Sequence, residues 1–292
     1  MTLHGPVVIA VDGGGHSDET LRWGLAEADL RDADVLLVRS WEEPVQVSAW
    51  GWYPATGDWR PEDDARRYLE DAERRARSDG VPRRLATRVL HGPTVPALLA
   101  VSTDAQLLVV GAHSSAGTAR LGRVASHVAA HAHAPVAVVR EPHPTPAGPV
   151  VVGVDGSAAS VCAARDAADE AERHGTHLVV LHARPTVADP YGLQHAAAMP
   201  LVPVGQDDPS RAATEALATE LRGRHPGLQV DVEVVDDHPG HALVTRSRSA
   251  ALVVVGCRGL GAFRGMLLGS VSHDVLRGAR STVLVARDEH AA

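Results

Sequence analysis

The sequence of 292 residues contains no lysine, so arginine supplies all 28 of its Lys/Arg side chains. A Walker A phosphate loop needs a lysine immediately before its Ser or Thr, and this class of nucleotide site is therefore excluded. Asp and Glu outnumber Arg by 36 to 28, which gives a net charge of −8 at pH 7. This balance is unlike the basic surface of a nucleic-acid-binding protein, and we expect no nucleic-acid partner.

Cysteine and long apolar runs are also scarce. The two cysteines, Cys162 and Cys257, are too few for a disulfide framework and fit a reducing compartment. No apolar run approaches the ~18 residues of a membrane span. The first residues, 1–6, lack the basic and apolar regions of a signal peptide. We therefore expect a cytoplasmic protein with no membrane partner.

The chain repeats itself at about half its length, which indicates a duplicated domain. Three apolar segments of the first half recur in the same order in the second half. The matched pairs are 6–13 with 149–156, 107–111 with 252–256, and 135–140 with 282–287. Prolines in the intervening residues 141–148 favour an extended spacer. We predict two domains, 1–141 and 149–292.

Apolar runs and helical periodicities alternate along both halves. The expected strands are 6–11, 35–39, 85–90, 107–110, 135–139, 150–154, 177–182, 229–235, 252–255 and 282–286. The expected helices are 17–31, 61–78, one from 94, 122–132, 158–174, 208–223, 240–248 and 269–278. This alternation predicts an α/β fold of βαβ units with parallel sheets. Nearly continuous apolar strands are typical of a sheet that helices cover on both faces.

A glycine-rich stretch after the apolar run 253–255 is the most informative part of the chain. Gly256, Gly259, Gly269 and Ser270 have the pattern Gly-x2-Gly-x9-Gly-Ser, and a helical periodicity begins at Ser270. Glycines let backbone amides approach a ligand closely, and a helix N-terminus offers unpaired N–H donors with a partial positive charge. Together these features favour a phosphate site. The alternative is a glycine-rich turn without a ligand.

The spacing of these glycines resembles the ATP-binding signature of the universal stress protein family, and the resemblance covers both halves. It implies two tandem, doubly wound, five-stranded parallel domains with strand order 3-2-1-4-5. This fold is Rossmann-like and similar to that of the adenine nucleotide alpha hydrolases. It also implies an intramolecular pseudo-dimer of the two domains, with the fifth strands as the candidate contact. The implied role is nucleotide-dependent regulation in a stress response, with ATP, with or without Mg²⁺, as the cofactor.

The resemblance also implies which residues bind the nucleotide. Asp155, beside Gly156 at the end of the first strand, and Ala183, at the end of the second, would hold the adenine. The ribose and phosphate positions fall on Gly256, Gly259, Gly269, Ser270 and Val271. An alternative for Asp155 is a turn former or helix N-cap. Asp237, which stands where the first half has Gly92, either crowds the ligand or faces solvent.

The first half departs from this pattern. Ser114 stands where the second glycine belongs, the stretch from Gly111 to Gly122 is two residues shorter than its counterpart, and Arg123 replaces Ser270. We predict an altered or purely structural site there, and one competent nucleotide site per chain, in the second half. The alternative is that Arg123 meets a phosphate as a bidentate donor.

Histidines, tryptophans and Cys257 carry weaker signals. His127, His131 and His133 cluster near a helix end, but no cysteine or carboxylate completes a structural-zinc set, and we expect no metal site. Four of the five tryptophans lie in 41–59, which could be a lid, a partner surface or a local cluster. Cys257 lies inside the glycine loop, either as a small pocket residue or as a redox-sensitive thiol.

No catalytic residue is assigned. The sequence has no Gly-x-Ser-x-Gly elbow and no carboxylate pair that its pattern places together. Slow ATP hydrolysis remains one alternative function, and an ATP-independent interaction module that uses 41–59 is another. ADP, AMP and cyclic nucleotides remain open as ligands. The expected partners are an adenine nucleotide, a regulatory protein and a second copy of the chain.

Overall fold

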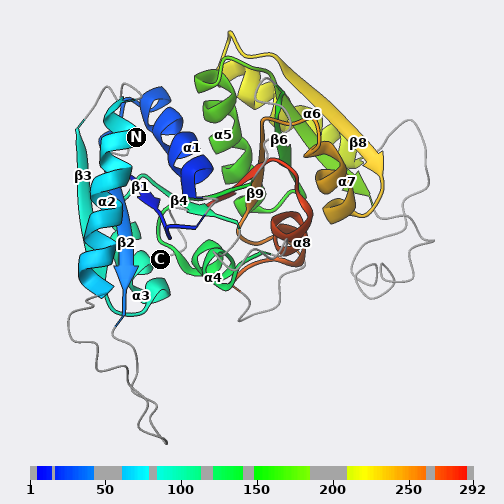
Figure 1. Cartoon of the computed structure of the whole chain (residues 1–292). Coiled ribbons are helices and arrows are strands. Elements are labelled where there is room, and N and C mark those ends of the chain that lie inside the picture. Colours follow the sequence, from blue (N-terminus) through cyan, green and yellow to red (C-terminus); the bar gives the residue numbers. More distant parts are fainter. Residues whose placement is uncertain are drawn as a thin grey trace, which may run out of the picture.

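The computed structural model describes residues 5–14, 17–42, 61–78, 84–112, 121–140, 148–184, 209–260 and 267–287. Two halves of the same architecture lie side by side in this structure (Figure 1). The first half comprises β1 (Val7–Ala10), α1 (Ser17–Leu30), β2 (Val35–Trp41), α2 (Pro61–Ser78), β3 (Leu85–His91), α3 (Thr94–Ser102), β4 (Leu107–Gly111), α4 (Arg123–His131) and β5 (Val136–Val139). The second half comprises β6 (Val150–Gly153), α5 (Ala158–Arg173), β7 (Leu178–Arg184), α6 (Pro209–Arg224), β8 (Val230–Asp236), α7 (Pro239–Arg246), β9 (Leu252–Gly256), α8 (Ser270–Gly278) and β10 (Thr282–Ala286).

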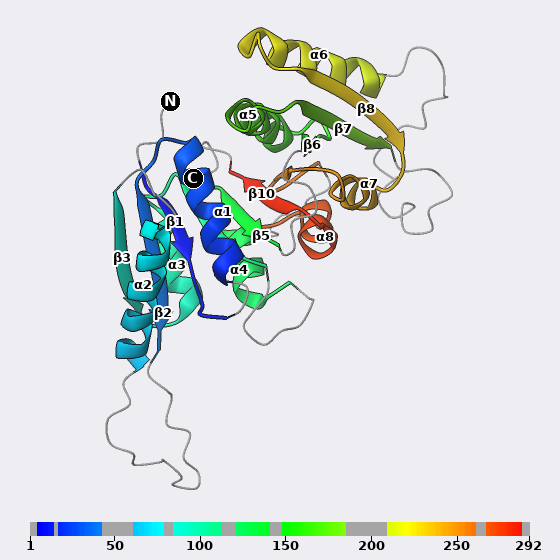
Figure 2. The same ribbon diagram turned by 45° about the horizontal axis from the view of Figure 1, so that its top comes forward.

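The strands form one ten-stranded sheet in the order β3-β2-β1-β4-β5-β10-β9-β6-β7-β8. Each half therefore has the predicted order 3-2-1-4-5, and the pairings within each half are parallel. The fifth strands join the halves as an antiparallel pair in which Leu284 lies opposite Ala137 (Figure 2). The α/β fold with two doubly wound halves is confirmed, and the fifth strands pair across the junction between them.

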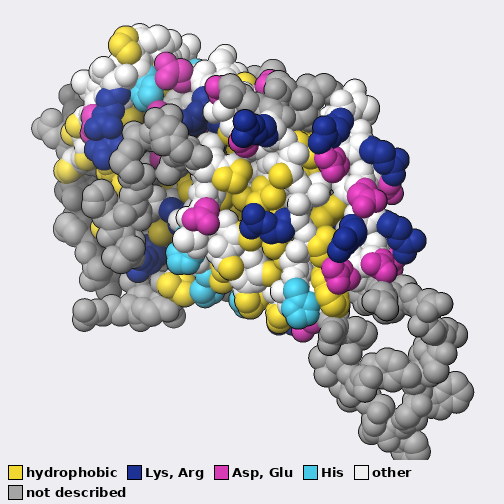
Figure 3. Space-filling model, turned by 90° about the vertical axis from the view of Figure 1, so that its left-hand side faces the viewer, with side chains coloured by type: hydrophobic (Ala, Val, Ile, Leu, Met, Phe, Trp, Pro, Cys, Tyr) yellow, Lys and Arg dark blue, Asp and Glu magenta, His cyan; other side chains and the backbone are white. Residues whose placement is uncertain are grey.

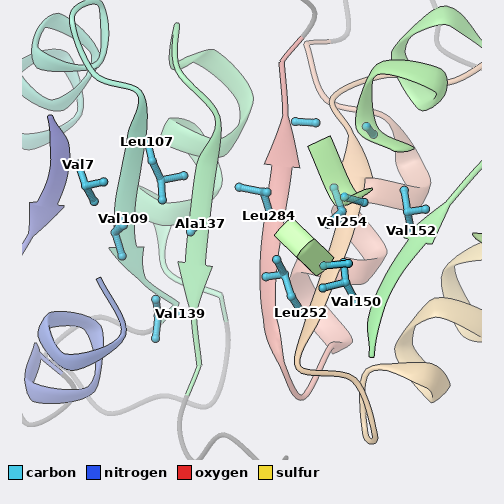
Figure 4. Packing of buried hydrophobic residues seen from close by; sticks show 14 of the residues in the cluster. Val7, Leu107, Val109, Ala137, Val139, Val150, Val152, Leu252, Val254 and Leu284 are labelled. Carbon is cyan, nitrogen blue, oxygen red and sulfur yellow. The ribbon is translucent and has the colours of Figure 1, made fainter. Parts of the chain in front are cut away.

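Residues alternate between the two faces of the sheet along each strand. Val7 and Ile9 pack against α1 and α2, whereas Val8 packs on the opposite face with α3 and α4. The second half repeats this arrangement with α5 and α6 on one face and α7 and α8 on the other. Ala137 and Leu284 belong to the same core, so the packing continues across the junction (Figure 4). Helices on both faces explain why the strands are apolar along their whole length.

Two equivalent arginines donate hydrogen bonds across the junction of the halves, beside the β5–β10 pair. Arg140 follows β5 and donates to the carbonyl of Leu276 in the last turn of α8. Arg287 follows β10 and donates to the carbonyls of Val128, Ala129 and Ala130 in the last turns of α4. A cation at a helix C-terminus satisfies free carbonyls and complements the helix dipole. Each half therefore caps a helix of the other.

The surface carries charges of both signs close together. On α2, Arg66 pairs with Glu62 at 2.9 Å and Arg77 with Glu73, both at i,i+4 spacing. The face viewed in Figure 3 shows arginines and acidic side chains intermixed, without a patch of one sign. Among the helices that the structure describes, none is long and apolar enough to cross a bilayer.

Candidate nucleotide site at the strand ends of the second half

The turn after β6 is built by Asp155 and Gly156. Gly156 has φ of +85°, a region that glycine adopts without strain. Asp155 Oδ1 accepts a hydrogen bond of 3.0 Å from the Ser157 amide, and Ser157 in turn caps α5 by accepting from the Ser160 amide at 3.2 Å. The turn-forming role considered for Asp155 is therefore present, whereas Ser157 is the N-cap. This turn holds the carboxylate at the carboxyl end of the sheet.

The second oxygen of Asp155 contacts the glycine loop. Oδ2 accepts a hydrogen bond of 2.8 Å from the Leu260 amide. A Cβ on Gly259 would overlap this same oxygen, so a larger residue at position 259 would displace the Asp155 carboxylate. Burial acts to raise the pKa of Asp155, but hydrogen bonds from Ser157, Leu260 and Ser160 outweigh it and hold the pKa below its ordinary value. Asp155 is therefore ionised at neutral pH, with lone pairs left for further donors.

The two ends of the glycine loop are tied together at their base. The Gly269 amide donates to the Cys257 carbonyl at 2.8 Å, and the Ser272 hydroxyl donates to the Gly256 carbonyl at 2.6 Å. A Cβ on Gly256 would lie 3.0 Å from the Ala159 carbonyl oxygen, so close backbone packing favours glycine there. Residues 261–266, between these ends, lie outside the described part of the chain. The base therefore fixes where α8 begins.

Helix α8 begins at the end of the loop, and within the described residues no side chain caps its N-terminus. Gly269 is its N-cap and provides no capping side chain, and the first intrahelical bond shown runs from the His273 amide to the Gly269 carbonyl at 3.0 Å. Ser270 is exposed in the first turn and Val271 is half-buried. The amides of this turn carry the positive end of the helix dipole, which is the arrangement that binds phosphate.

Ala183 lies near the end of β7, paired in register with Val235 of β8. It is buried at the same edge of the sheet as Asp155, because β6 and β7 are parallel neighbours. Asp237 follows β8 and directs its carboxylate to His241 at 2.7 Å, with 37% of its side chain exposed. This geometry favours the solvent-facing alternative for Asp237.

The equivalent turn of the first half is filled by an arginine. A Cβ on Gly13 would overlap the guanidinium of Arg39, which also lies 4.6 Å from the ring centroid of Tyr68. Around Gly156 no atom of the described residues lies within 4 Å of the corresponding position. Among these residues, the space beside the turn is thus open in the second half and occupied in the first. Sequence reasoning missed Arg39, although its place in β2 opposite the turn could have indicated it.

Asp12 of the first half directs its carboxylate to its own turn. Its Oδ1 accepts from the Ser17 hydroxyl at 2.7 Å and from the Gly14 amide at 2.9 Å. The Gly122 amide donates to the Ala112 carbonyl at 2.8 Å, which matches the loop base of the second half. Ser114 lies outside the described residues, and Arg123 is exposed in the first turn of α4. Each half therefore has its own hydrogen bond at the base of the loop. A hydrogen bond from the loop to the strand-end aspartate is described only in the second half.

The histidine cluster near the end of α4 does not converge. His127 and His131 each turn Nδ1 toward a carbonyl four residues earlier, at 2.9 and 2.8 Å, and their rings stack at 6.1 Å. Cys257 is a buried free thiol below the loop. Of the tryptophan segment 41–59, only the first two residues are described, and Trp41 packs edge-on against His91 at 4.8 Å. The segment's expected roles stay predictions.

Comparison with known proteins decides the family. The family model described as "Universal stress protein family" matches residues 4–140 and again 147–287. The chain belongs to the universal stress protein family. Universal stress protein Rv2005c of Mycobacterium tuberculosis is 37% identical over 300 residues, which cover 97% of each chain. The suspected tandem membership is therefore confirmed.

Solved structures of this family share the fold. A universal stress protein from Archaeoglobus fulgidus aligns over 97% of this chain and 98% of its own, with a TM-score of 0.64 and 16% identity. A universal stress protein crystallised in complex with cAMP aligns over 48% of this chain and 98% of its own, with a TM-score of 0.36 and 28% identity. At 16% identity, the likeness to the Archaeoglobus fulgidus protein shows a shared fold and nothing further.

Proposed function

We propose that this universal stress protein binds an adenine nucleotide, with ATP as the preferred ligand, at the strand ends of its second half. The observation that carries the proposal is the hydrogen bond from the Leu260 amide to Asp155 beside the N-terminus of α8, where Gly269 provides no capping side chain. An ionised carboxylate and the first-turn amides of α8 then lie on either side of one loop. The carboxylate suits hydroxyl and amine donors of a nucleoside, and the amides suit its phosphates.

The proposed binding residues keep their sequence-based assignments. Asp155, Gly156 and Ala183 would hold the nucleoside, and Gly256, Gly259, Gly269, Ser270 and Val271 its ribose and phosphates. Because Leu260 already donates to Oδ2 of Asp155, a nucleoside donor that uses this oxygen either shares it with the loop or displaces the amide. Through that oxygen, nucleotide binding would be coupled to the position of the loop. We propose that this coupling is how the protein signals as a regulatory module in the cytoplasm.

One nucleotide per chain is the expected stoichiometry. In the first half Arg39 fills the space beside Gly13, and Arg123 puts a cation where the helix dipole is already positive. The proposed domain limits, 1–141 and 149–292, assign one altered and one competent site. A regulatory protein partner, a second copy of the chain and an accompanying Mg²⁺ ion belong to the same proposal.

Titration calorimetry with ATP tests the proposal on the wild-type chain and on Gly259→Glu. The glutamate would overlap Asp155 and repel the phosphates, so we expect binding heat to disappear. Ser114→Glu is the matched control, because it places the same residue at the equivalent position of the first half. Equal heats for the wild type and Gly259→Glu would remove this loop from the site. Repeating the titration with ADP, AMP and cAMP, and with and without Mg²⁺, identifies the ligand.

A further inference from the structure

A buried polar cluster lies between the two halves, on the sheet face opposite α4 and α8. Helices α1 and α5 approach each other there (Figure 1), with Glu27 on one and Glu170 on the other. Each glutamate lies 15 residues after the strand-end aspartate of its own half, so the two are equivalent positions. Their side chains are 1% and 3% exposed, and His174, which ends α5, is 18% exposed. Three potential ligands therefore meet at the junction.

Arg31 and Arg173 donate hydrogen bonds to the Oε1 atoms of the two glutamates. Arg31 Nε donates to Glu27 Oε1 at 2.6 Å, and its Nη2 donates to Glu170 Oε1. Arg173 donates to the same Glu170 oxygen at 2.8 Å. The guanidiniums thus fix both carboxylates through Oε1 and leave the two Oε2 atoms for other partners.

The remaining carboxylate oxygens converge on the imidazole. His174 Nε2 lies 2.9 Å from Glu27 Oε2 and 3.9 Å from Glu170 Oε2, and one ligand atom from each residue lies within 4.8 Å of the others. In tetrahedral zinc sites with bonds of about 2.0–2.2 Å, ligand atoms lie roughly 3.3–3.6 Å apart. The observed spacings bracket that value, so small side-chain movements would place all three around one ion.

Glu170 Oε2 is the second observation that points to a ligand. It is fully buried and has no hydrogen-bond partner in the described residues. A buried carboxylate oxygen without a partner is costly, and either a proton shared with Glu27 or a bound ion would satisfy it. Because Oε2 is directed toward His174, the missing partner belongs between these two side chains.

The charges around the cluster suit a divalent cation. Arg31 interacts with Glu27, Glu170 and Asp166, and Arg173 with Glu170 and Asp169. Carboxylates therefore outnumber guanidiniums around the cluster, which favours a cation there. His174 is the most exposed of the three ligands, so an ion can enter along its edge.

We propose that Glu27, Glu170 and His174 form a metal site between the two halves, suited to Zn²⁺. One imidazole nitrogen and two carboxylate oxygens are ligands that zinc accepts, and water completes the fourth position. Arg31 holds the carboxylates from outside, in the way that hydrogen bonds commonly orient metal ligands. The site joins both halves of the chain, so the bound ion stabilises their association.

The two carboxylates differ in their protonation when no metal is bound. Burial and the neighbouring Glu27 raise the pKa of Glu170 to about 8. For Glu27, burial raises the pKa, but hydrogen bonding to His174 and the charge of Arg31 outweigh it and lower the pKa to about 2. The metal-free pair therefore keeps one proton at pH 7.

Calorimetry with Zn²⁺ tests the site on the full chain after removal of metals with EDTA. We expect one tight site per chain in the wild type and at least about tenfold weaker binding in Glu170→Gln and His174→Gln. His131→Gln is the matched control, since it removes an exposed histidine of α4 and should leave the tight site intact. Co²⁺ in place of Zn²⁺ should give the visible absorption of a tetrahedral ion, lost in the same two variants.

Equal zinc affinity in the wild type and Glu170→Gln would overturn the proposal, as would loss of the tight site in His131→Gln. Circular dichroism of each variant shows whether it is folded. If both ligand variants unfold, wild-type crystals grown with Zn²⁺ decide the question. An anomalous peak between Glu27 and His174 supports the site, and its absence there rejects it.

Discussion

The two halves share a backbone plan but differ in what occupies the equivalent positions of their strand-end turns. No described residue lies beside a Cβ position on Gly156, whereas the guanidinium of Arg39 lies against Gly13. Asp155 reaches across to the Leu260 amide, whereas Asp12 binds its own turn through Ser17. A duplicated fold therefore preserves the loop base while side chains at a few positions decide whether a ligand fits. The asymmetry is a property of side chains and loop length, not of topology.

The largest expected difference between equivalent residues concerns Glu170 and Glu27. Because the folded-state pKa of Glu170 is raised to about 8 from 4.5, folded protein holds a proton that the unfolded chain releases above pH 4.5. Stability from this residue is complete below about pH 4.5 and is lost as the pH rises to about 8, by up to about 1.4 kcal/mol per pH unit. Glu27 has the opposite sign, and its contribution is lost as the pH falls from 4.5 toward 2.

Urea denaturation of the metal-free chain between pH 5 and pH 8 measures this effect. Glu170→Gln keeps a neutral side chain of the same shape and should have a flatter pH profile than the wild type. Parallel profiles for the two proteins would show that Glu170 does not carry the proton. Titrating groups that do not contact Glu170 are common to both proteins and cancel in the difference.

The next largest expected effect compares the two arginines that cap a helix of the opposite half. Arg140→Ala leaves the Leu276 carbonyl of α8 without its donor, and Arg287→Ala does the same for carbonyls of α4. Each substitution should lower the free energy of unfolding by about 1–3 kcal/mol, the cost of a buried group left unsatisfied. Arg277→Ala, on the exposed side of α8, is the control and should change stability by less than about 0.5 kcal/mol. A large loss for only one of the pair would show that the junction is asymmetric.

A third comparison separates the two strand-end aspartates. Asp155→Asn removes the charge that faces the loop, and we expect ATP to bind about tenfold more weakly, equivalent to about 1.4 kcal/mol. Asp12→Asn should leave the affinity unchanged, because Asp12 lies in the half that we expect not to bind nucleotide. Titration calorimetry measures both. A loss of affinity in Asp12→Asn would contradict the assignment of one site per chain.

The smallest expected effect concerns the loop base. The Ser272 hydroxyl donates to the Gly256 carbonyl, whereas the equivalent residue of the first half is Ala125. Ser272→Ala should lower the free energy of unfolding by about 1 kcal/mol through the lost hydrogen bond. Ser270→Ala, at the exposed first turn of α8, should leave the stability of the nucleotide-free protein nearly unchanged. Chemical denaturation of both variants distinguishes a structural hydroxyl from an exposed one.

Element positions were largely predictable, because apolar runs and periodicity are local properties. The predicted helix 61–78 matches α2, and the predicted strand 282–286 matches β10. The predicted strand 177–182 ends too early, since β7 continues to Arg184. Arg184 pairs with Asp236 at the end of β8, and this contact between neighbouring strands extends the ladder beyond the apolar run. The apolar pattern of one strand cannot predict a contact with its neighbour, so it could not predict where β7 ends.

The candidate site was predictable only in outline. The glycine spacing indicated a phosphate loop, but the contact of Leu260 with Asp155 joins residues 105 positions apart. Likewise, the sequence pattern led us to expect no metal site, and the cluster proposed here was not considered. Glu27 and His174 lie 147 positions apart and lack the close spacing by which metal motifs are recognised.

The sequence by itself determined the duplication, the alternation of strands and helices, and the loss of the second glycine and of the serine in the first loop. These features follow from residue type and local spacing. Only the tertiary structure decided that β5 pairs antiparallel with β10, which brings α1 beside α5 and Glu27 beside Glu170. It also decided that Arg39 fills the first turn. These contacts depend on how the two packed halves are oriented, and no local pattern in the chain encodes that orientation.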